Sequence, residues 1–158
     1  MRLFIAGVVI CSTAVTVSSQ QTAGRAMKID DLIGAIRVTD PQLTPDGGHV
    51  AFVRTITDLK TGDRNADIWI VAADGSSEPR GLILAGKTDN TPRFSPDGRR
   101  LAFSQEKDLV VWDFQAPGIT HRMAVDQLGQ FGMCFLKDGQ QLASGGCNGW
   151  IGLWDLTA

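Results

Sequence analysis

A glycine-rich segment near the end of the chain has the spacing of a nucleophile turn. Gly145-Gly146-Cys147-Asn148-Gly149 carries a cysteine where the Gly-x-Ser-x-Gly turn of serine hydrolases carries its serine. That turn must join a strand to a helix, which exposes the nucleophile. Here Trp150-Ile151-Gly152-Leu153-Trp154 follows, and it alternates as a strand does. We therefore interpret the segment as a tight turn between strands and predict that Cys147 is not catalytic.

Two histidines could serve such a nucleophile as its base. His49 follows a Gly-Gly turn, and His121 comes shortly after a Pro-Gly turn. Because strands begin after such turns, we expect both imidazoles to face solvent at strand ends. The chain contains no Gly-x-Ser-x-Gly sequence. The sequence predicts no catalytic residue and no enzyme activity for the chain itself.

Three aspartates, Asp58, Asp63 and Asp67, lie close enough in sequence to suggest a calcium loop. Their spacing differs from the Asp-x-Asp-x-Asp-Gly pattern, so we interpret them as part of a solvated loop. The chain has no Cys-x-x-Cys or His-x-x-x-His pair, and no glycine-rich phosphate loop between a strand and a helix. The sequence therefore predicts neither a metal site nor a cofactor.

The elements that would position these residues recur three times. Each repeat has an Asp-Gly turn, then an alanine-containing strand, then a strand with tryptophan. The copies are Thr44-Pro45-Asp46-Gly47 with Val50-Ala51-Phe52 and Ile68-Trp69-Ile70-Val71, then Ser95-Pro96-Asp97-Gly98 with Leu101-Ala102-Phe103 and Val110-Val111-Trp112-Asp113, and then Leu136-Lys137-Asp138-Gly139 with Leu142-Ala143-Ser144 and Ile151-Gly152-Leu153-Trp154-Asp155. A period of roughly 40–50 residues is typical of four-stranded propeller blades. We expect Trp69, Trp112 and Trp154 to share one position of the repeat and to pack in a core or on a sheet face.

Alternating β-branched and aromatic residues predict strands between the turns. Pro-Asp-Gly suits the turns, because proline presets φ, aspartate bonds its own backbone and glycine accepts a positive φ. Predicted strands lie near 42–43, 49–56, 67–73 and 80–84, then 93–94, 100–105, 109–114 and 121–125, then 132–135, 141–144 and 150–156. We predict an all-β fold, a partial β-propeller of about two and three-quarter four-stranded blades over residues 38–158, preceded by a short helix.

Residues 24–37 are predicted to form a linker and this short helix. Apolar residues recur at helical spacing from Ile29 to Ile36, and Asp30 or Asp31 can cap the first turn. Gly34 lies in mid-helix, where glycine is unfavourable. We expect the helix to pack on the edge of the propeller.

Residues 1–23 have the layout of a secretory signal peptide. Met1-Arg2 supplies a positive charge, the stretch to Val17 is uncharged and mostly apolar, and small polar residues follow. The apolar run is shorter than the ~20 residues of a membrane span, although an uncleaved anchor is the alternative. Cleavage after Ser19 or after Ala23 fits the small residues there. We expect an exported protein, periplasmic or extracellular, with no membrane attachment after cleavage.

Charge and cysteine content limit the classes of partner. The net charge is −2, the pI is about 5.6, and the basic residues are scattered, so we predict no nucleic-acid binding. Beyond residue 23 the cysteines are Cys134 and Cys147. In a hairpin turned at Asp138-Gly139, Cys134 faces Ala143 and lies too far from Cys147 for a disulfide. We predict two unpaired thiols.

Two resemblances accompany these patterns. Residues 30–103 resemble the N-terminal propeller of secreted prolyl oligopeptidase-family enzymes, the acylaminoacyl-peptidase-like group. The resemblance rests on Asp30-Asp31-Leu32, Val38-Thr39-Asp40-Pro41-Gln42-Leu43-Thr44-Pro45-Asp46-Gly47, Val50-Ala51-Phe52, Asp67-Ile68-Trp69-Ile70-Val71 and Ser95-Pro96-Asp97-Gly98. Residues 109–158 resemble WD repeats through Leu142-Ala143-Ser144-Gly145-Gly146, Asn148-Gly149 and Ile151-Gly152-Leu153-Trp154-Asp155-Leu156. Because Asn148 replaces the usual aspartate and no Gly-His pair precedes it, the Asp–His–Ser–Trp network of WD repeats is not expected here.

The peptidase resemblance implies a hydrolase domain after the propeller, with the propeller screening substrates. The chain stops at Ala158, directly after the third tryptophan strand. We therefore expect an incomplete propeller, either a fragment of a longer ancestor or an arc that closes by self-association through exposed edge strands. Trp150 and Trp154 share one face of their strand, and we expect that face to lie uncovered.

Three functions follow. The first is a non-catalytic, exported propeller-type interaction or scaffold module, which a truncated gene remnant would also provide. Its protein or peptide partner is unidentified. The alternative is the propeller portion of a prolyl oligopeptidase-family serine peptidase whose hydrolase domain is missing from this chain. A ligand sensor that binds at the blade ends is a third class.

Overall fold

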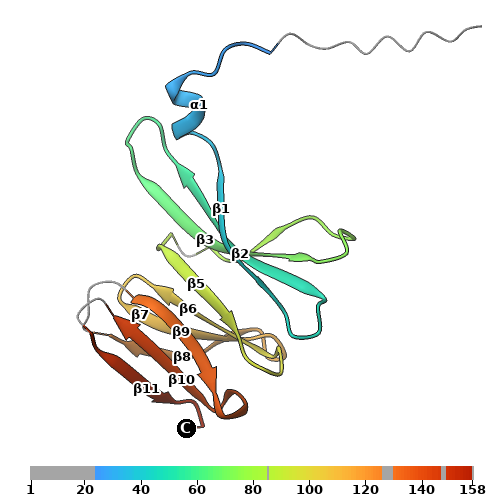
Figure 1. The fold of residues 1–158 in the computed structure, drawn as a ribbon, viewed down its shortest axis with the longest axis vertical. Coiled ribbons are helices and arrows are strands. Elements are labelled where there is room, and N and C mark those ends of the chain that lie inside the picture. The colour runs from blue at the N-terminus through green and yellow to red at the C-terminus, as the bar shows by residue number, and fades with distance from the viewer. Residues whose placement is uncertain (1–23, 85, 126–129, 147–148, 158) are drawn as a thin grey trace, which may run out of the picture.

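The chain folds into three antiparallel sheets that follow one another in sequence (Figure 1). The structure is a computed structural model and describes residues 24–84, 86–125, 130–146 and 149–157. Its strands are β1 (Arg37–Leu43), β2 (His49–Thr57), β3 (Arg64–Ala72) and β4 (Arg80–Ile83), then β5 (Asp89–Phe94), β6 (Arg100–Gln105), β7 (Asp108–Asp113) and β8 (Gly118–Ala124), then β9 (Gln130–Leu136), β10 (Gln141–Gly146) and β11 (Ile151–Asp155). Within each sheet, strands adjacent in sequence are hydrogen-bonded neighbours. Two four-stranded sheets and one of three strands confirm the predicted partial propeller, and the sheets are its blades 1, 2 and 3.

The turn between β1 and β2 is held by its own side chains. The hydroxyl of Thr44 donates to Oδ1 of Asp46 at 2.6 Å and accepts from the N–H of His49 at 2.9 Å. Gly47 takes a φ of 73°, which glycine adopts without strain. The Ser95 turn of blade 2 repeats both bonds at the same two distances. The repeated Thr/Ser-Pro-Asp-Gly sequence therefore joins the first and second strands of a blade, as predicted.

The third turn differs because Leu136 has no hydroxyl to organise it. The chain instead makes a short 3₁₀ turn over Lys137–Gly139. The carbonyl of Gly139 accepts a hydrogen bond of 2.6 Å from Nη2 of Arg100. Blade 2 thus supplies a polar contact that the third turn lacks on its own.

β1 and β5 each contain a bulge at an X-Pro pair. The pairing register shifts around Asp40-Pro41 in β1 and around Thr91-Pro92 in β5, and φ is 48° at Asp40 and 52° at Thr91. Both strands lie at a sheet edge, where proline removes no ladder hydrogen bond. The strands therefore begin at residues 37 and 89, earlier than the predicted 42 and 93.

Apolar cores fill the two boundaries between blades. The first contains Ala51, Val53 and Ile68 of blade 1 with Leu101, Phe103 and Val110 of blade 2. The second contains Ala102, Leu109 and Val111 of blade 2 with Met133 and Leu142 of blade 3. Because successive strand residues face opposite sides, β6 contributes to both cores. Each fully buried aliphatic or aromatic side chain contributes about 1.5–3 kcal/mol relative to exposure.

The tryptophans confirm the predicted sheet-face packing but not the predicted common position. Trp112 lies opposite Leu101, and Trp154 lies opposite the equivalent Leu142; both are partly buried against the two cores. Trp69 instead lies opposite Phe52, one strand period away from that position. The shift of Trp69 could not be predicted from the sequence spacing, because the first repeat has extra residues in its β2–β3 hairpin.

The uncovered face of blade 3 is not the predicted one. Trp150 and Trp154 pack against the second core, with ring centroids 5.9 Å apart, so their face is half-buried against blade 2. The alternating residues Ile151 and Leu153 are 76% and 67% exposed. The prediction of an uncovered tryptophan face was wrong because it left out packing against blade 2. Nε1 of Trp154 also donates to the hydroxyl of Ser144 at 3.0 Å, which joins two of the four residue types of the WD-repeat network.

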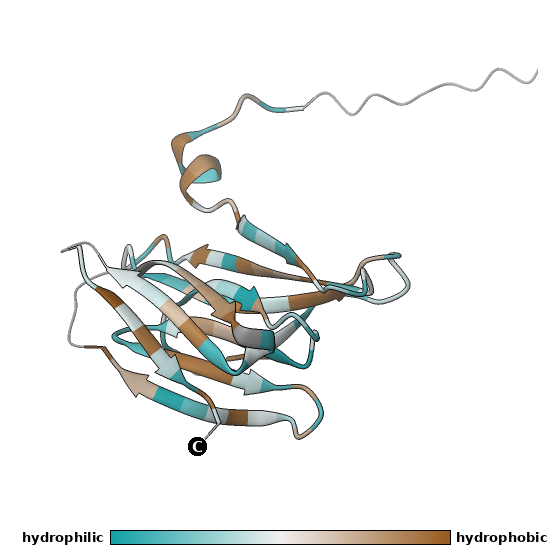
Figure 2. Cartoon of the chain, turned by 60° about the horizontal axis from the view of Figure 1, so that its bottom comes forward, coloured by the Kyte–Doolittle hydropathy of each residue, from teal (hydrophilic) through white to brown (hydrophobic). Residues whose placement is uncertain are grey.

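The helix α1 (Ile29–Ile33) is shorter than predicted, and its apolar side chains are exposed. It ends at Gly34, whose N–H donates to the carbonyl of Asp30 at 2.8 Å. Ile29 is 75% exposed, and α1 lies beyond the end of blade 1 and not over its face (Figures 1 and 2). The prediction that the helix packs on the propeller was therefore wrong, because glycine ends it after little more than one turn. In the part of the chain that the structure describes, no helix has the length and apolarity to cross a bilayer.

Candidate functional site

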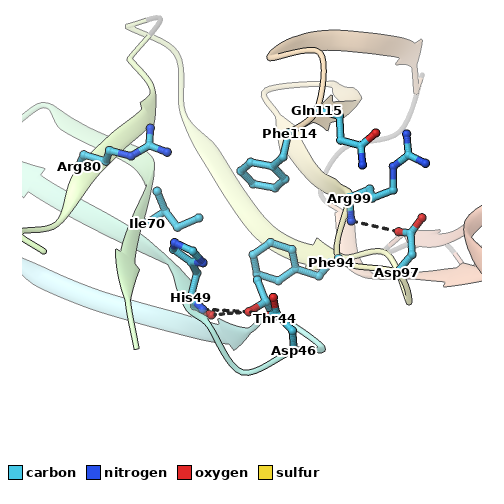
Figure 3. A pocket seen from close by; sticks show the side chains of 11 residues that line it. Thr44, Asp46, His49, Ile70, Arg80, Phe94, Asp97, Arg99, Phe114 and Gln115 are labelled. Atoms are coloured by element: carbon cyan, nitrogen blue, oxygen red, sulfur yellow. Dashed lines mark hydrogen bonds between the residues drawn. The ribbon is translucent and has the colours of Figure 1, made fainter. Parts of the chain in front are cut away.

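A cavity of about 310 Å³ lies at the boundary between blades 1 and 2 (Figure 3). Blade 1 contributes the β1–β2 turn, one residue of β3 and the first residue of β4. Blade 2 contributes the end of β5, its Ser-Pro-Asp-Gly turn and the residues that follow β7. The lining residues are Thr44, Asp46, His49, Ile70, Arg80, Phe94, Asp97, Gly98, Arg99, Phe114 and Gln115.

The centre of this interblade cavity is aromatic. Phe94 ends β5 and Phe114 directly follows β7, and their rings stack with centroids 6.0 Å apart and planes 29° apart. Both are only partly buried, so they present apolar surface to the cavity. Figure 3 shows them between Arg80, Ile70 and His49 on one side and Arg99, Gln115 and Asp97 on the other.

The two aspartates of the cavity are engaged by their own turns. The hydroxyl of Thr44 is the main cause that lowers the pKa of Asp46, with the N–H of Gly48. At Asp97 burial opposes ionisation, yet the hydroxyl of Ser95, the N–H of Arg99 and nearby arginine charge lower the pKa overall. Both carboxyls are therefore ionised near neutral pH and belong to the turns.

The two arginines differ in their surroundings. Arg99 lies in the turn beside Asp97, and its charge also helps to lower the pKa of Asp113. Arg80 begins β4 opposite Ile70, its side chain is exposed, and it forms no ion pair within the described residues. The cavity is therefore lined by two arginines and two aspartates around its aromatic centre.

The histidines are not brought together. His49 is exposed at the start of β2, as predicted, and lines the interblade cavity. His121 is only partly exposed, so its predicted solvent-facing position was wrong in part. Its Nδ1 lies 3.0 Å from the hydroxyl of Thr120, and its ring lines a separate cavity of about 200 Å³ with Arg99 and Asp113.

The three aspartates considered as a calcium loop do not gather at one place in the structure. Asp58 organises the β2–β3 loop by accepting the N–H of Lys60 at 2.8 Å. Asp67 lies within β3 and is 7% exposed, so its predicted solvated position was wrong. Across the described ranges, no three His, Cys, Asp or Glu side chains gather in a way that could hold a metal ion.

Cys134 lies exposed on β9, opposite Ala143 as predicted. Cys147 and Asn148 lie outside the described residues, so the predicted turn at Gly145–Gly149 and the predicted free thiol at Cys147 remain predictions.

A second polar cluster extends from the buried Asp89 to the exposed Arg122. Nε2 of Gln105 donates to Oδ1 of Asp89 at 2.9 Å, and Arg122 donates to Oε1 of Gln105 at 2.8 Å and to Asp108 at 2.7 Å. Asp89 is fully buried, and its Oδ2 has no hydrogen-bond partner among the described residues. Burial is the main cause that raises the pKa of Asp89 to about 6, and the Asp67 carboxyl adds repulsion.

Sequence reasoning missed the interblade cavity because its residues come from six separate segments. The repeat did contain one signal: Phe94 directly precedes the Ser95 turn, and Phe114 directly follows the tryptophan strand. Both flanking residues belong to blade 2 and line the cavity at its boundary with blade 1.

Comparison with known proteins places these features in context. No protein-family model matches the chain. The chain is 36% identical to the uncharacterized peptidase YuxL of Bacillus subtilis (strain 168) over 80 residues, and these residues are 50% of the chain. It is 26% identical over 99 residues, or 63% of the chain, to dipeptidyl-peptidase 5 of Porphyromonas gingivalis. These matches span only 12% and 14% of the two relatives' lengths.

Solved structures of acylaminoacyl peptidase share the fold. One from Pyrococcus horikoshii matches with a TM-score of 0.57 and 20% identity over 74% of the chain. A second, in complex with Z-Gly-Gly-Phe-chloromethyl ketone, matches with a TM-score of 0.59 and 19% identity over the same share. The chain covers 18% of each solved chain. These matches confirm the predicted resemblance to the propeller of prolyl oligopeptidase-family enzymes.

Proposed function

We propose that this chain is the propeller portion of an exported protein of the peptidase-related group and is itself non-catalytic. The observation that carries the proposal is the 36% identity to a peptidase over 80 residues, together with a fold shared with acylaminoacyl peptidase. Hydrolysis, in this proposal, belongs to a hydrolase domain outside these residues.

The described residues support a non-catalytic role. His49 and His121 line separate cavities, and the interblade cavity is lined by no serine or cysteine. The Thr44 hydroxyl that does line it is held by Asp46 and by the N–H of His49. A nucleophile and base within hydrogen-bond reach of each other are the minimum for acyl transfer.

The direct experiment uses the purified mature chain and a fluorophosphonate probe that labels active serine hydrolases. We expect no labelling and no hydrolysis of peptide p-nitroanilides, whereas a serine peptidase labelled in parallel reacts. Labelling that disappears on replacing one serine would show that the chain is catalytic and would falsify this part of the proposal.

The peptidase relationship is tested by reading the DNA after the Ala158 codon in all frames. A hydrolase domain with a Gly-x-Ser-x-Gly turn, in frame or one frameshift away, supports it. The outcome against it is a downstream region without such a domain. That outcome favours a self-standing interaction module, for which the Ser144–Trp154 hydrogen bond of blade 3 is the supporting observation.

Export is proposed from the composition of residues 1–23. Mass spectrometry of the secreted or periplasmic protein should find a mature N-terminus at Gln20 or Gly24. A protein that retains Met1 in the cytoplasmic fraction would contradict export.

A further inference from the structure

We propose that the interblade cavity binds the C-terminal end of a peptide, with the last apolar side chain on Phe94 and Phe114 and the terminal carboxylate on Arg80. The proposal concerns binding by this chain and does not depend on the peptidase relationship.

The apolar half of the proposed site is the stacked pair Phe94 and Phe114, joined by Ile70 of β3. The two rings are partly buried, so their orientation is fixed by the core beneath while one surface faces the cavity. Ligand cavities usually have about 300–1,000 Å³. At about 310 Å³, this one suits one or two residues and not a longer segment.

The charged half is Arg80. Asp46 and Asp97 accept hydrogen bonds within their turns, and the charge of Arg99 acts on Asp97, so these three groups are engaged on the turn side of the cavity. Arg80 forms no ion pair among the described residues and reaches the cavity from β4. A guanidinium presents paired donors that match a carboxylate. The lining thus has two carboxylates held by their turns and two guanidinium groups, of which Arg80 is the one outside those turns.

The remaining polar side chains suit a peptide better than a simple organic acid. Gln115 offers both an amide donor and an amide acceptor at the rim, on the blade 2 side, and His49 offers a ring nitrogen on the blade 1 side (Figure 3). A C-terminal residue can place its side chain on the rings and its carboxylate on Arg80. Its own peptide N–H and the preceding carbonyl can then form hydrogen bonds with Gln115 and His49. The half-open cavity lets the rest of the peptide leave toward solvent.

The test measures binding of N-acetyl-Ala-Phe to the full mature chain by isothermal titration calorimetry. Its C-terminal amide and N-acetyl-Ala-Ala serve as matched ligands. We expect the free acid to bind at least tenfold more tightly than the amide, because the amide loses the charge-assisted bond to Arg80. We also expect N-acetyl-Ala-Ala to bind at least tenfold more weakly than N-acetyl-Ala-Phe, because alanine cannot cover the rings.

Two arginine variants assign the carboxylate contact. Arg80→Gln should remove the difference between acid and amide, whereas Arg37→Gln, at another exposed arginine of blade 1 outside the cavity, should leave it unchanged. Circular dichroism of both variants checks that the sheets persist. Arg80→Lys keeps the charge and should retain part of the preference, which separates charge from a structural effect.

Three results would overturn the proposal. The first is no saturable binding of N-acetyl-Ala-Phe at millimolar concentration. The second is equal affinity for acid and amide, or an equal loss in Arg37→Gln and Arg80→Gln. The third is binding of 3-phenylpropionate as tight as that of the dipeptide, which would make the site one for small aromatic acids.

Discussion

The guanidinium of Arg93 reaches from blade 2 to the carboxylate of Asp40 in blade 1. Its Nη1 lies 2.8 Å from Oδ2 and 3.0 Å from Oδ1, and the two side chains are 29% and 28% exposed. Arg93 directly follows the bulge at Thr91-Pro92, and Asp40 belongs to the equivalent bulge of β1. The two bulges therefore place the ion pair where the edge strands β1 and β5 meet.

Replacing Arg93 with glutamine should lower the free energy of unfolding by about 1–2 kcal/mol, more than an exposed pair contributes and less than a fully buried one. The loss arises because Asp40 remains partly buried without its cation. Urea denaturation followed by tryptophan fluorescence measures it. Lys87→Gln is the control, because Lys87 and Glu106 are 44% and 55% exposed, and it should change stability by less than about 0.5 kcal/mol. Equal effects of the two changes would contradict the role of the Arg93 pair.

Asp89 should make the folded state less stable as the pH rises from about 4 to about 6. Burial raises its pKa from the usual 3.8 to about 6, so the folded chain holds a proton that the unfolded chain has already released. Stability from this group is therefore fully present below pH 4 and is lost as the pH passes through the folded pKa. The size of the effect is about 2–3 kcal/mol.

The variant Asp89→Asn keeps the hydrogen bond from Gln105 and cannot ionise. We expect it to be more stable than the natural chain at pH 8 and similar at pH 3.5 in urea titrations. Asp30→Asn, which alters an exposed carboxyl on α1, is the matched control and should show no such pH-dependent gain. An Asp89→Asn variant that is destabilised at pH 8 would mean that the charged carboxylate is needed.

Gly152 has no room for a side chain. A Cβ at this position of β11 would overlap the indole of Trp150, whereas a Cβ on Gly132 of β9 would meet open space. Gly152→Ala should therefore cost about 1–3 kcal/mol through displacement of the tryptophan. Gly132→Ala, in the same sheet, should be neutral or slightly stabilising. Thermal unfolding of both variants tests the difference, and equal melting temperatures would rule out the overlap.

The exposed face of blade 3 should promote self-association. Ile151 and Leu153 lie on β11, which pairs only with β10 among the described strands. We expect light scattering to detect oligomers at tens of micromolar and Ile151→Lys to reduce them. Ile29→Lys makes the same change at an equally exposed isoleucine on α1, 75% against 76%, and should have no effect. A natural chain that stays monomeric over this range would refute the expectation.

The blade strands could be predicted because the residues of each turn are sufficient to form that turn. Thr44 and Ser95 organise their turns through bonds that span only a few residues, so the local sequence suffices. The sheet-face packing of Trp112 and Trp154 followed from the repeat for the same reason. The bulges at Pro41 and Pro92 could have been predicted too, since each proline precedes its turn aspartate by the same spacing.

The interblade cavity and the buried state of Asp67 and Asp89 could not be predicted in this way. They depend on which strands of one blade pack against the next blade. That packing involves segments far apart in the sequence, so no single segment predicts it. The uncovered face of blade 3 was mispredicted for the same reason, since alternation alone does not say which face of β11 meets blade 2.

The order of strands within each blade has a consequence for stability. Every described strand pairs with its neighbour in sequence, whereas the apolar cores join one blade to the next. The strand pairs within a blade are therefore formed between segments that follow one another directly. Because a repeat cannot bury its apolar face alone, each blade gains its stability from the neighbour that packs on it, and the loss of one blade should destabilise the blade beside it.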